Sequence, residues 1–133
     1  MLLTACSSTT VPQVGDAVPC QIQSVEQVEQ AVLAGLTAEH WEIISSSFHI
    51  VQARKTQRQM QVTIDVAYGY RGFSIEYGDS QNMGYDIDDD TIDSAYVKWV
   101  YNLKNFIDKV LKQEVKLLPP TKCFALKDQY QQE

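Results

Sequence analysis

The sequence predicts an α+β fold, a two-layer sandwich in which two helices cover one face of a four-stranded antiparallel sheet. Three observations lead to this prediction. Apolar residues recur at helical spacing near both ends of the chain, they alternate with polar residues in between, and the alternating runs are joined by short connections. The expected order is α-β-β-β-β-α, and the most economical packing lays both helices on the apolar face of the sheet.

The first predicted helix begins after Ser24 and ends near Glu39. Ser24 followed by Gln27 fits a capping box, in which the serine side chain accepts a hydrogen bond from the first turn of the helix. Apolar residues then recur at helical spacing, with polar residues on the other side, at Val25, Val28, Val32 and Leu36. This pattern predicts an amphipathic helix of roughly four turns.

Four strands are predicted between Trp41 and Tyr77, where the apolar period changes from that of a helix to that of a strand. Residues 41–44 and 48–54 form the first two strands, with serines 45–47 as their turn. The buried face of the second strand stays open, because Ile50 and Val51 point to opposite sides. The other two alternate clearly, with apolar Met60, Val62, Ile64 and Val66, and then Phe73, Ile75 and Tyr77. Short connections, the third of them bracketed by Gly69 and Gly72, favour hairpins, so we expect a meander that is covered on one side only.

The last predicted helix follows a longer loop, residues 78–90, and ends near Glu114. Its apolar stripe advances by alternate steps of four and three through Ile92, Tyr96, Trp99, Leu103, Phe106 and Val110. Acidic residues 88–90 precede it, where the positive end of the helix dipole favours them. The segment after it, with Pro119 and Pro120, is expected to be coil.

The composition indicates one globular domain. The chain has 133 residues, of which 44% are hydrophobic and 21% charged, so neither disorder nor a second domain is expected. The sequence has no run of about eighteen apolar residues that could span a membrane. The net charge is −6, and no segment gathers the basic residues that a phosphate backbone requires, so we expect no nucleic-acid partner.

The N-terminal residues Leu3-Thr4-Ala5-Cys6 resemble the lipobox of bacterial lipoproteins, in which small residues precede a cysteine that is lipidated. On this reading residues 1–5 are a residual signal peptide, and residues 6–19 are the lipidated Cys6 and a flexible linker rich in Ser, Thr, Pro and Gly. Residues 20–123 are then the single domain and 124–133 its tail. Because Ser7 rather than aspartate follows Cys6, the resemblance implies an outer-membrane lipoprotein that faces the periplasm. The alternative is a chance match in an intracellular protein.

The two remaining cysteines, Cys20 and Cys123, flank the predicted domain. In an oxidising periplasm they would form a disulfide that closes most of the chain into one loop, worth at most ~4–5 kcal/mol of stability. Two free, buried thiols are the alternative.

Residues of the last predicted helix resemble the signature of a known protein family. Ile92, Tyr96, Trp99, Val100, Asn102 and Leu103 resemble the Ile-His-x-x-Tyr-Asn-x-Trp-Val-x-Asn-Leu signature of a family of small, uncharacterised lipoproteins of Gram-negative bacteria. Residues 62–66, 73–77 and 79–85 are similar to the strand pair and the loop of that family, and the similarity spans about residues 24–112. The family's polar His and Asn are replaced here by Asp93 and Val97. The resemblance therefore implies a shared fold and lends no activity.

The sequence offers little for catalysis or metal binding. The acidic run from Asp86 to Asp90 is similar to a calcium loop, but Thr91 and Val97 stand where an EF-hand needs Gly and Glu. His40 and His49 are the two available imidazoles, and neither belongs to a catalytic motif or to a zinc-type spacing with cysteine. We therefore expect no enzyme, no metal and no cofactor.

A binding patch is predicted in the loop after the fourth strand together with the last helix, because loops on a rigid scaffold commonly carry binding residues. Its expected members are Asp79, Ser80, Asn82, Tyr85 and Tyr101. The expected function is that of a non-enzymatic envelope lipoprotein, a protein-binding or assembly module held to the membrane by its lipid. The alternative is a periplasmic carrier of a small apolar ligand in a cavity between sheet and helices.

Overall fold

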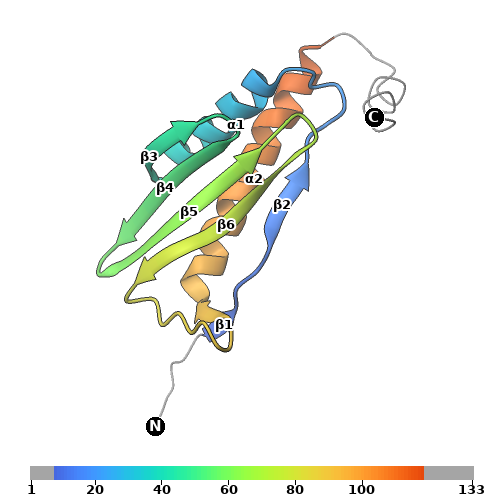
Figure 1. Ribbon diagram of the computed structural model, residues 1–133. Helices are drawn as coiled ribbons and strands as arrows, with labels where there is room; N and C mark the ends of the chain where they lie inside the picture. Colours follow the sequence, from blue (N-terminus) through green and yellow to red (C-terminus); the bar gives the residue numbers. More distant parts are fainter. Residues whose placement is uncertain (1–7, 119–133) are drawn as a thin grey trace.

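The computed structural model describes residues 8–118, and Figure 1 shows how they are arranged. The described part is an α+β fold with two helices, a five-stranded antiparallel sheet in the order β2-β6-β5-β4-β3, and a two-stranded antiparallel sheet of β1 and β7. The elements in chain order are β1 (Ser8–Thr10), β2 (Val14–Ala17), α1 (Val25–Ala38), β3 (Glu42–Ser47), β4 (Ile50–Gln57), β5 (Met60–Tyr68), β6 (Gly72–Gln81), β7 (Thr91–Asp93) and α2 (Ser94–Lys116).

The α+β class and the two helices are confirmed, but the predicted strand count and order are wrong. The meander is present as β3 to β6. Of the three further strands, β2 joins its sheet beside β6, and β1 and β7 form the separate small sheet. Two of these, β1 and β2, lie in the segment that was expected to be a flexible linker. Val14 of β2 is only 4% exposed, and the backbone of β2 pairs with β6 from Val14 opposite Ile75 to Ala17 opposite Gly72. A short edge strand needs few apolar side chains, because most of its stabilisation comes from backbone hydrogen bonds to its neighbour.

The first hairpin also differs from its prediction. The serines expected to form its turn belong to β3, and the turn lies at Phe48 and His49, where His49 adopts a positive φ of 71°. All six residues of β3 are exposed, since it is the outermost strand, and so its sequence lacks the alternation of a half-buried strand. The sequence left open which face of the next strand, β4, is buried. Val51 faces the core, whereas Ile50 is exposed.

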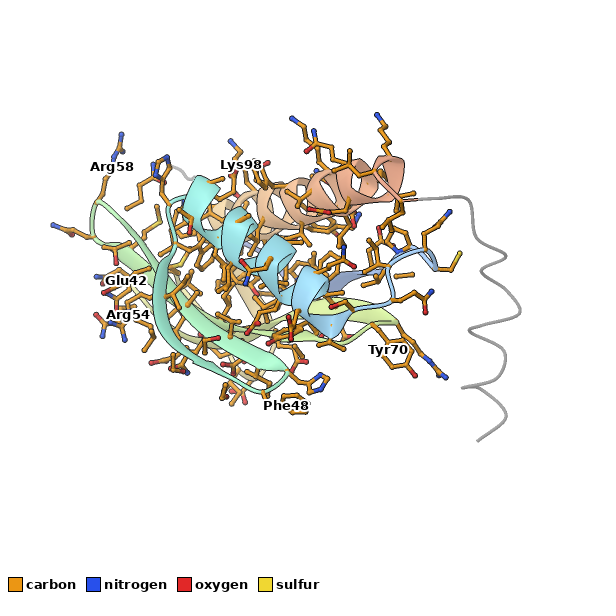
Figure 2. The ribbon with its side chains drawn as sticks, turned by 90° about the horizontal axis from the view of Figure 1, so that it is seen from above. Glu42, Phe48, Arg54, Arg58, Tyr70 and Lys98 are labelled. Carbon is orange, nitrogen blue, oxygen red and sulfur yellow. The ribbon has the colours of Figure 1, made fainter. Side chains whose placement is uncertain are left out.

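Both helices lie side by side on one face of the five-stranded sheet, as Figure 2 shows from above. The expected capping box is wrong, because the Ser24 side chain makes no capping hydrogen bond.

In α2 the buried stripe is rotated slightly from the predicted one: Phe106 and Val110 are half-buried, whereas Val100, Ile107 and Leu111 are fully buried. The helix begins at a cap formed by Asp93, whose carboxylate accepts a hydrogen bond from the backbone N–H of Ala95 at 2.8 Å.

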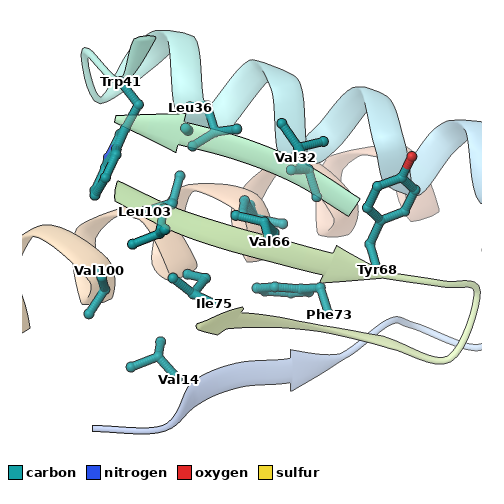
Figure 3. Close-up of a cluster of buried hydrophobic side chains, with 14 of the residues drawn as sticks. Val14, Val32, Leu36, Trp41, Val66, Tyr68, Phe73, Ile75, Val100 and Leu103 are labelled. Atoms are coloured by element: carbon teal, nitrogen blue, oxygen red, sulfur yellow. The ribbon is translucent and has the colours of Figure 1, made fainter. Parts of the chain in front are cut away.

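The core between the two layers is filled by apolar side chains from both (Figure 3). Trp99 and Ile64, one from each layer, are both buried, as the predicted packing requires. Among the described residues no charged side chain is fully buried. No helix in this part of the chain is long and apolar enough to cross a membrane.

Candidate binding cleft

The site that the fold builds most clearly lies along the outer edge of β6. Strand β6 pairs with β5 along most of its length, but β2 covers its other edge only from Gly72 to Ile75. Residues 76–81 therefore present an edge that no described strand covers. Their backbone N–H and C=O groups on that side are available to another chain.

At Glu76 and Tyr77 the uncovered edge opens on a cleft. Residues 11–13, which we call the strap, connect β1 in the small sheet to β2 in the large sheet (Figure 1). The backbone N–H of Val11 donates to the carbonyl oxygen of Asp90 at 2.8 Å and fixes the far end of the strap. A cleft of about 770 Å³ lies between strap and strand, lined by Val11, Pro12, Gln13, Val14, Gly15, Ser74, Ile75, Glu76, Tyr77, Tyr85 and Asp90.

Tyrosine side chains from three segments meet at this cleft. The rings of Tyr77 and Tyr85 stack with centroids 4.4 Å apart, and the ring of Tyr96 from α2 meets Tyr77 edge to face at 5.8 Å. The hydroxyls of Tyr77 and Ser80 are hydrogen-bonded at 2.7 Å. Tyr77 and Tyr85 line the cleft and are half-buried, so they offer flat apolar surface with a polar tip, a combination that is common at binding interfaces.

Burial raises the pKa of two hydroxyls in this cluster, those of Tyr77 and Tyr96. Desolvation raises the pKa of Tyr77 above its ordinary value, and the nearby charge of Asp79 raises it further. The pKa of the fully buried Tyr96 is raised strongly, mainly by desolvation. Among the described residues the Tyr96 hydroxyl has no hydrogen-bond partner. The hydroxyls of Tyr77 and Tyr96 therefore stay protonated to a higher pH than that of an ordinary tyrosine.

A β-bulge at Gly78 interrupts the pairing of β6 with β5 and determines which side chains of β6 face each side of the sheet. The register between β5 and β6 shifts at Thr63 and Ile64, so that Ile64 pairs with Tyr77 and Thr63 with Asp79, leaving Gly78 unpaired. A Cβ at Gly78 would lie 2.9 Å from the Thr63 carbonyl oxygen, so glycine is required there. The extra residue keeps Tyr77 and Ser80 on the helix side of the sheet, while Glu76 and Asp79 share the open side.

The structure brings some members of the predicted patch together and leaves others apart. Ser80 and Tyr85 both contact Tyr77, and Asp79 is close enough to influence the Tyr77 hydroxyl. Asn82 adopts a positive φ of 60° and donates from its side chain to the Gln59 carbonyl oxygen at 2.8 Å, toward the turn between β4 and β5. Tyr101 lies on α2, 41% exposed, and is not among the residues that line the cleft.

Tyr77 and the strap were missed by sequence reasoning. Tyr77 alternates with the core residues of β6, so its pattern predicts a buried side chain rather than the wall of a cleft. The strap carries no periodic signal at all. It becomes part of the site only because β1 and β2 pair with strands that lie some sixty to eighty residues away along the chain.

The acidic run and the histidines are the remaining candidates that the sequence offered. No group of three His, Cys, Asp or Glu side chains in that range could hold a metal ion. The Asp86 carboxylate accepts hydrogen bonds from the backbone N–H groups of Asp88 and Asp89, at 2.9 and 3.2 Å, which orders the loop. The imidazole of His49 is hydrogen-bonded to the Tyr68 carbonyl oxygen at 2.7 Å.

Several predictions fall on parts of the chain that lie outside the described residues. These are the residual signal peptide, the lipidation site Cys6, the tail at 124–133, and Cys123 of the expected disulfide. Cys20 itself is disulfide-bonded. Its pairing with Cys123 stays a prediction.

The chain matches no model of a known protein family and no curated protein. The resemblance noted at the last helix therefore stays a prediction, and the function is inferred from the cleft.

Proposed function

We propose that this chain is a non-enzymatic binding module of the bacterial cell envelope, held to the outer membrane through lipid on Cys6 and facing the periplasm. Its cleft binds an extended segment of a protein partner. The observation that carries this proposal is the uncovered edge of β6 at residues 76–81, whose first two residues line the cleft together with Tyr85.

An extended peptide suits such a site because it can add to the sheet as a further strand. Backbone hydrogen bonds to the exposed edge supply affinity that does not depend on sequence, and contacts to side chains at alternate positions supply specificity. Tyr77 and Tyr85 offer the contact surface on the helix side of the sheet. The strap turns away from β6 just before Val14, the first residue of β2. The partner segment would therefore take the place beside β6 that lies in line with β2.

The position of the cleft favours this function over that of a small-ligand carrier. A carrier needs a cavity between sheet and helices, where the apolar side chains of both layers are packed against each other (Figure 3). The contact between the helices is close enough that even one added carbon at Gly35 would lie 2.8 Å from Ile107. The cleft lies instead at the edge of the sheet.

The test is photo-crosslinking in the intact envelope of the native bacterium. A photoreactive phenylalanine analogue replaces Glu76 at the uncovered edge in one strain, and Gln52 on the open face of β4 in another. We expect a discrete protein adduct from position 76 and none from position 52. The adduct should be lost in a Tyr85→Ala background and kept in a Tyr101→Ala background, because Tyr85 lines the cleft and Tyr101 does not. Equal adducts from both positions, or none from either, would refute binding at this edge.

The anchor is tested separately. Metabolic labelling with palmitate should label the wild-type chain, and Cys6→Ala should abolish the label and release the protein from the membrane fraction. A labelled Cys6→Ala variant would contradict the assignment of Cys6 as the lipidated residue.

A further inference from the structure

We infer that the partner segment is cationic, with Lys or Arg side chains alternating with apolar or aromatic ones along the strand that it adds to β6. This inference rests on the proposed function for the location of the site. It adds the charge of the partner and the sequence pattern that the site selects.

The first support is a pair of like charges in register. Asp65 on β5 and Glu76 on β6 are directly opposite each other on the open side of the sheet. Like charges in this position destabilise a sheet. Within the described part of the chain neither carboxylate takes part in an ion pair, since both ion pairs found there involve Lys104. The fold therefore tolerates a repulsion that a cationic partner would relieve.

The second support is the charge around the cleft as a whole. Asp79 follows Glu76 on the open side of β6, after the bulge, and Asp90 lies across the cleft beside the strap. The residues that line the cleft include two carboxylates, Glu76 and Asp90, and neither Lys nor Arg. An acidic cleft attracts a basic segment during encounter and discriminates against an acidic one.

The two faces of β6 predict the pattern of the partner. Successive side chains of an added strand point to opposite faces of the sheet. One set would lie on the open side, beside Glu76 and Asp79 of β6, and the other set on the helix side, beside Tyr77 and Tyr85. The first set should be basic and the second apolar or aromatic. The uncovered edge accommodates about six residues, a length of ~20 Å.

The experiment uses three synthetic hexapeptides with blocked ends that alternate valine with lysine, threonine or glutamate. Each is labelled with a fluorophore, and its binding to the full-length lipidated chain in nonionic detergent micelles is measured by fluorescence anisotropy. We expect the lysine peptide to bind at least tenfold more tightly than the threonine peptide, and the glutamate peptide to bind more weakly still. Raising the salt from 50 to 500 mM should remove most of this difference, because the charges lie near solvent.

Charge reversal supplies the decisive variants. In Glu76→Lys/Asp79→Lys the preference should invert toward the glutamate peptide, since both replaced side chains are exposed on the open side of β6. The matched control, Glu26→Lys/Glu42→Lys, makes the same change of net charge at exposed positions on α1 and β3. It should keep the wild-type preference. Circular dichroism confirms that each variant is folded.

The outcomes separate this inference from the proposed function. Equal binding of the three peptides, or loss of the preference in the control variant, would overturn the inference about charge while leaving strand binding in place. Absence of peptide binding would also overturn it if the adduct from position 76 still forms in the envelope. If that adduct is absent as well, both the inference and the proposed function fail.

Discussion

Gly35 of α1 lies directly against Ile107 of α2, and a Cβ at Gly35 would be 2.8 Å from Ile107 Cγ1. The same Cβ would be 3.2 Å from Leu103 Cδ1. The two helices therefore approach each other through a position where only hydrogen fits. Through this contact α1 and α2 pack directly against each other on the face of the sheet that they cover.

Replacing that glycine tests how tightly the helices are packed. Gly35→Ala gains helix propensity, about 1 kcal/mol, but forces the Ile107 side chain to move, which costs ~1–3 kcal/mol in a well-packed core. We expect a net loss of about 1 kcal/mol in the free energy of unfolding, measured by urea denaturation. Thr37→Ala, at an exposed position of the same helix, should be neutral or slightly stabilising. An unchanged or higher midpoint for Gly35→Ala would mean that the helices are further apart.

The N-terminal strand is tested at Val14, which is buried where β2 meets β6. Val14→Ser removes apolar contacts and places a hydroxyl in the core, so the free energy of unfolding should fall by about 2 kcal/mol. Gln13→Ser, one residue earlier and exposed, should change it by less than about 0.5 kcal/mol. Equal, small effects at both positions would show that residues 8–17 are not part of the folded domain.

The buried hydroxyl of Tyr96 predicts a stabilising substitution. Because that hydroxyl lacks a hydrogen-bond partner among the described residues, Tyr96→Phe should raise the free energy of unfolding by about 1 kcal/mol near neutral pH. Tyr101→Phe, at an exposed tyrosine of the same helix, should have no effect. A loss of stability in Tyr96→Phe would mean that the hydroxyl has a partner.

The same tyrosine predicts how stability depends on alkaline pH. Its pKa in the folded chain is raised above the ordinary value of 10.0, and those of Tyr68 and Tyr77 are raised as well. Below pH 10 the stability that depends on protonation of these three hydroxyls is fully present. Above it the unfolded chain releases these protons while the folded chain retains them, so the free energy of unfolding falls as the pH rises. Thermal melts between pH 8 and 11 should show a shallower decline for Tyr96→Phe than for the wild type.

The start of α2 is tested at Asp93, whose carboxylate accepts a hydrogen bond from the Ala95 N–H. Asp93→Ala should cost about 1 kcal/mol of stability, and Asp93→Asn much less, because asparagine is also a good cap. Asp88→Ala, in the exposed loop before the helix, should be nearly neutral. If both alanine variants lose the same stability, the effect would come from the helix dipole rather than from the cap.

Elements with long, regular patterns were predicted well. Both helices and the central pair β5 and β6 show clear periodicity, because each has one face in the core and one in solvent. Strand β3 was predicted too short, since a fully exposed strand carries no such pattern and serine is typical of turns. Of the predicted patch, Ser80 and Tyr85 lie at the tyrosine cluster, while Tyr101 lies apart on α2.

The amino-acid sequence by itself determined which faces of the main helices and strands are apolar, and hence that two helices cover one side of an antiparallel sheet. It did so because burial of side chains follows from their periodicity. Only the tertiary structure decided where residues 8–17 lie and which part of the β6 edge stays uncovered. Backbone hydrogen bonds between strands are alike for nearly every residue type, so the choice of neighbour at a sheet edge depends on which edge the rest of the fold leaves accessible.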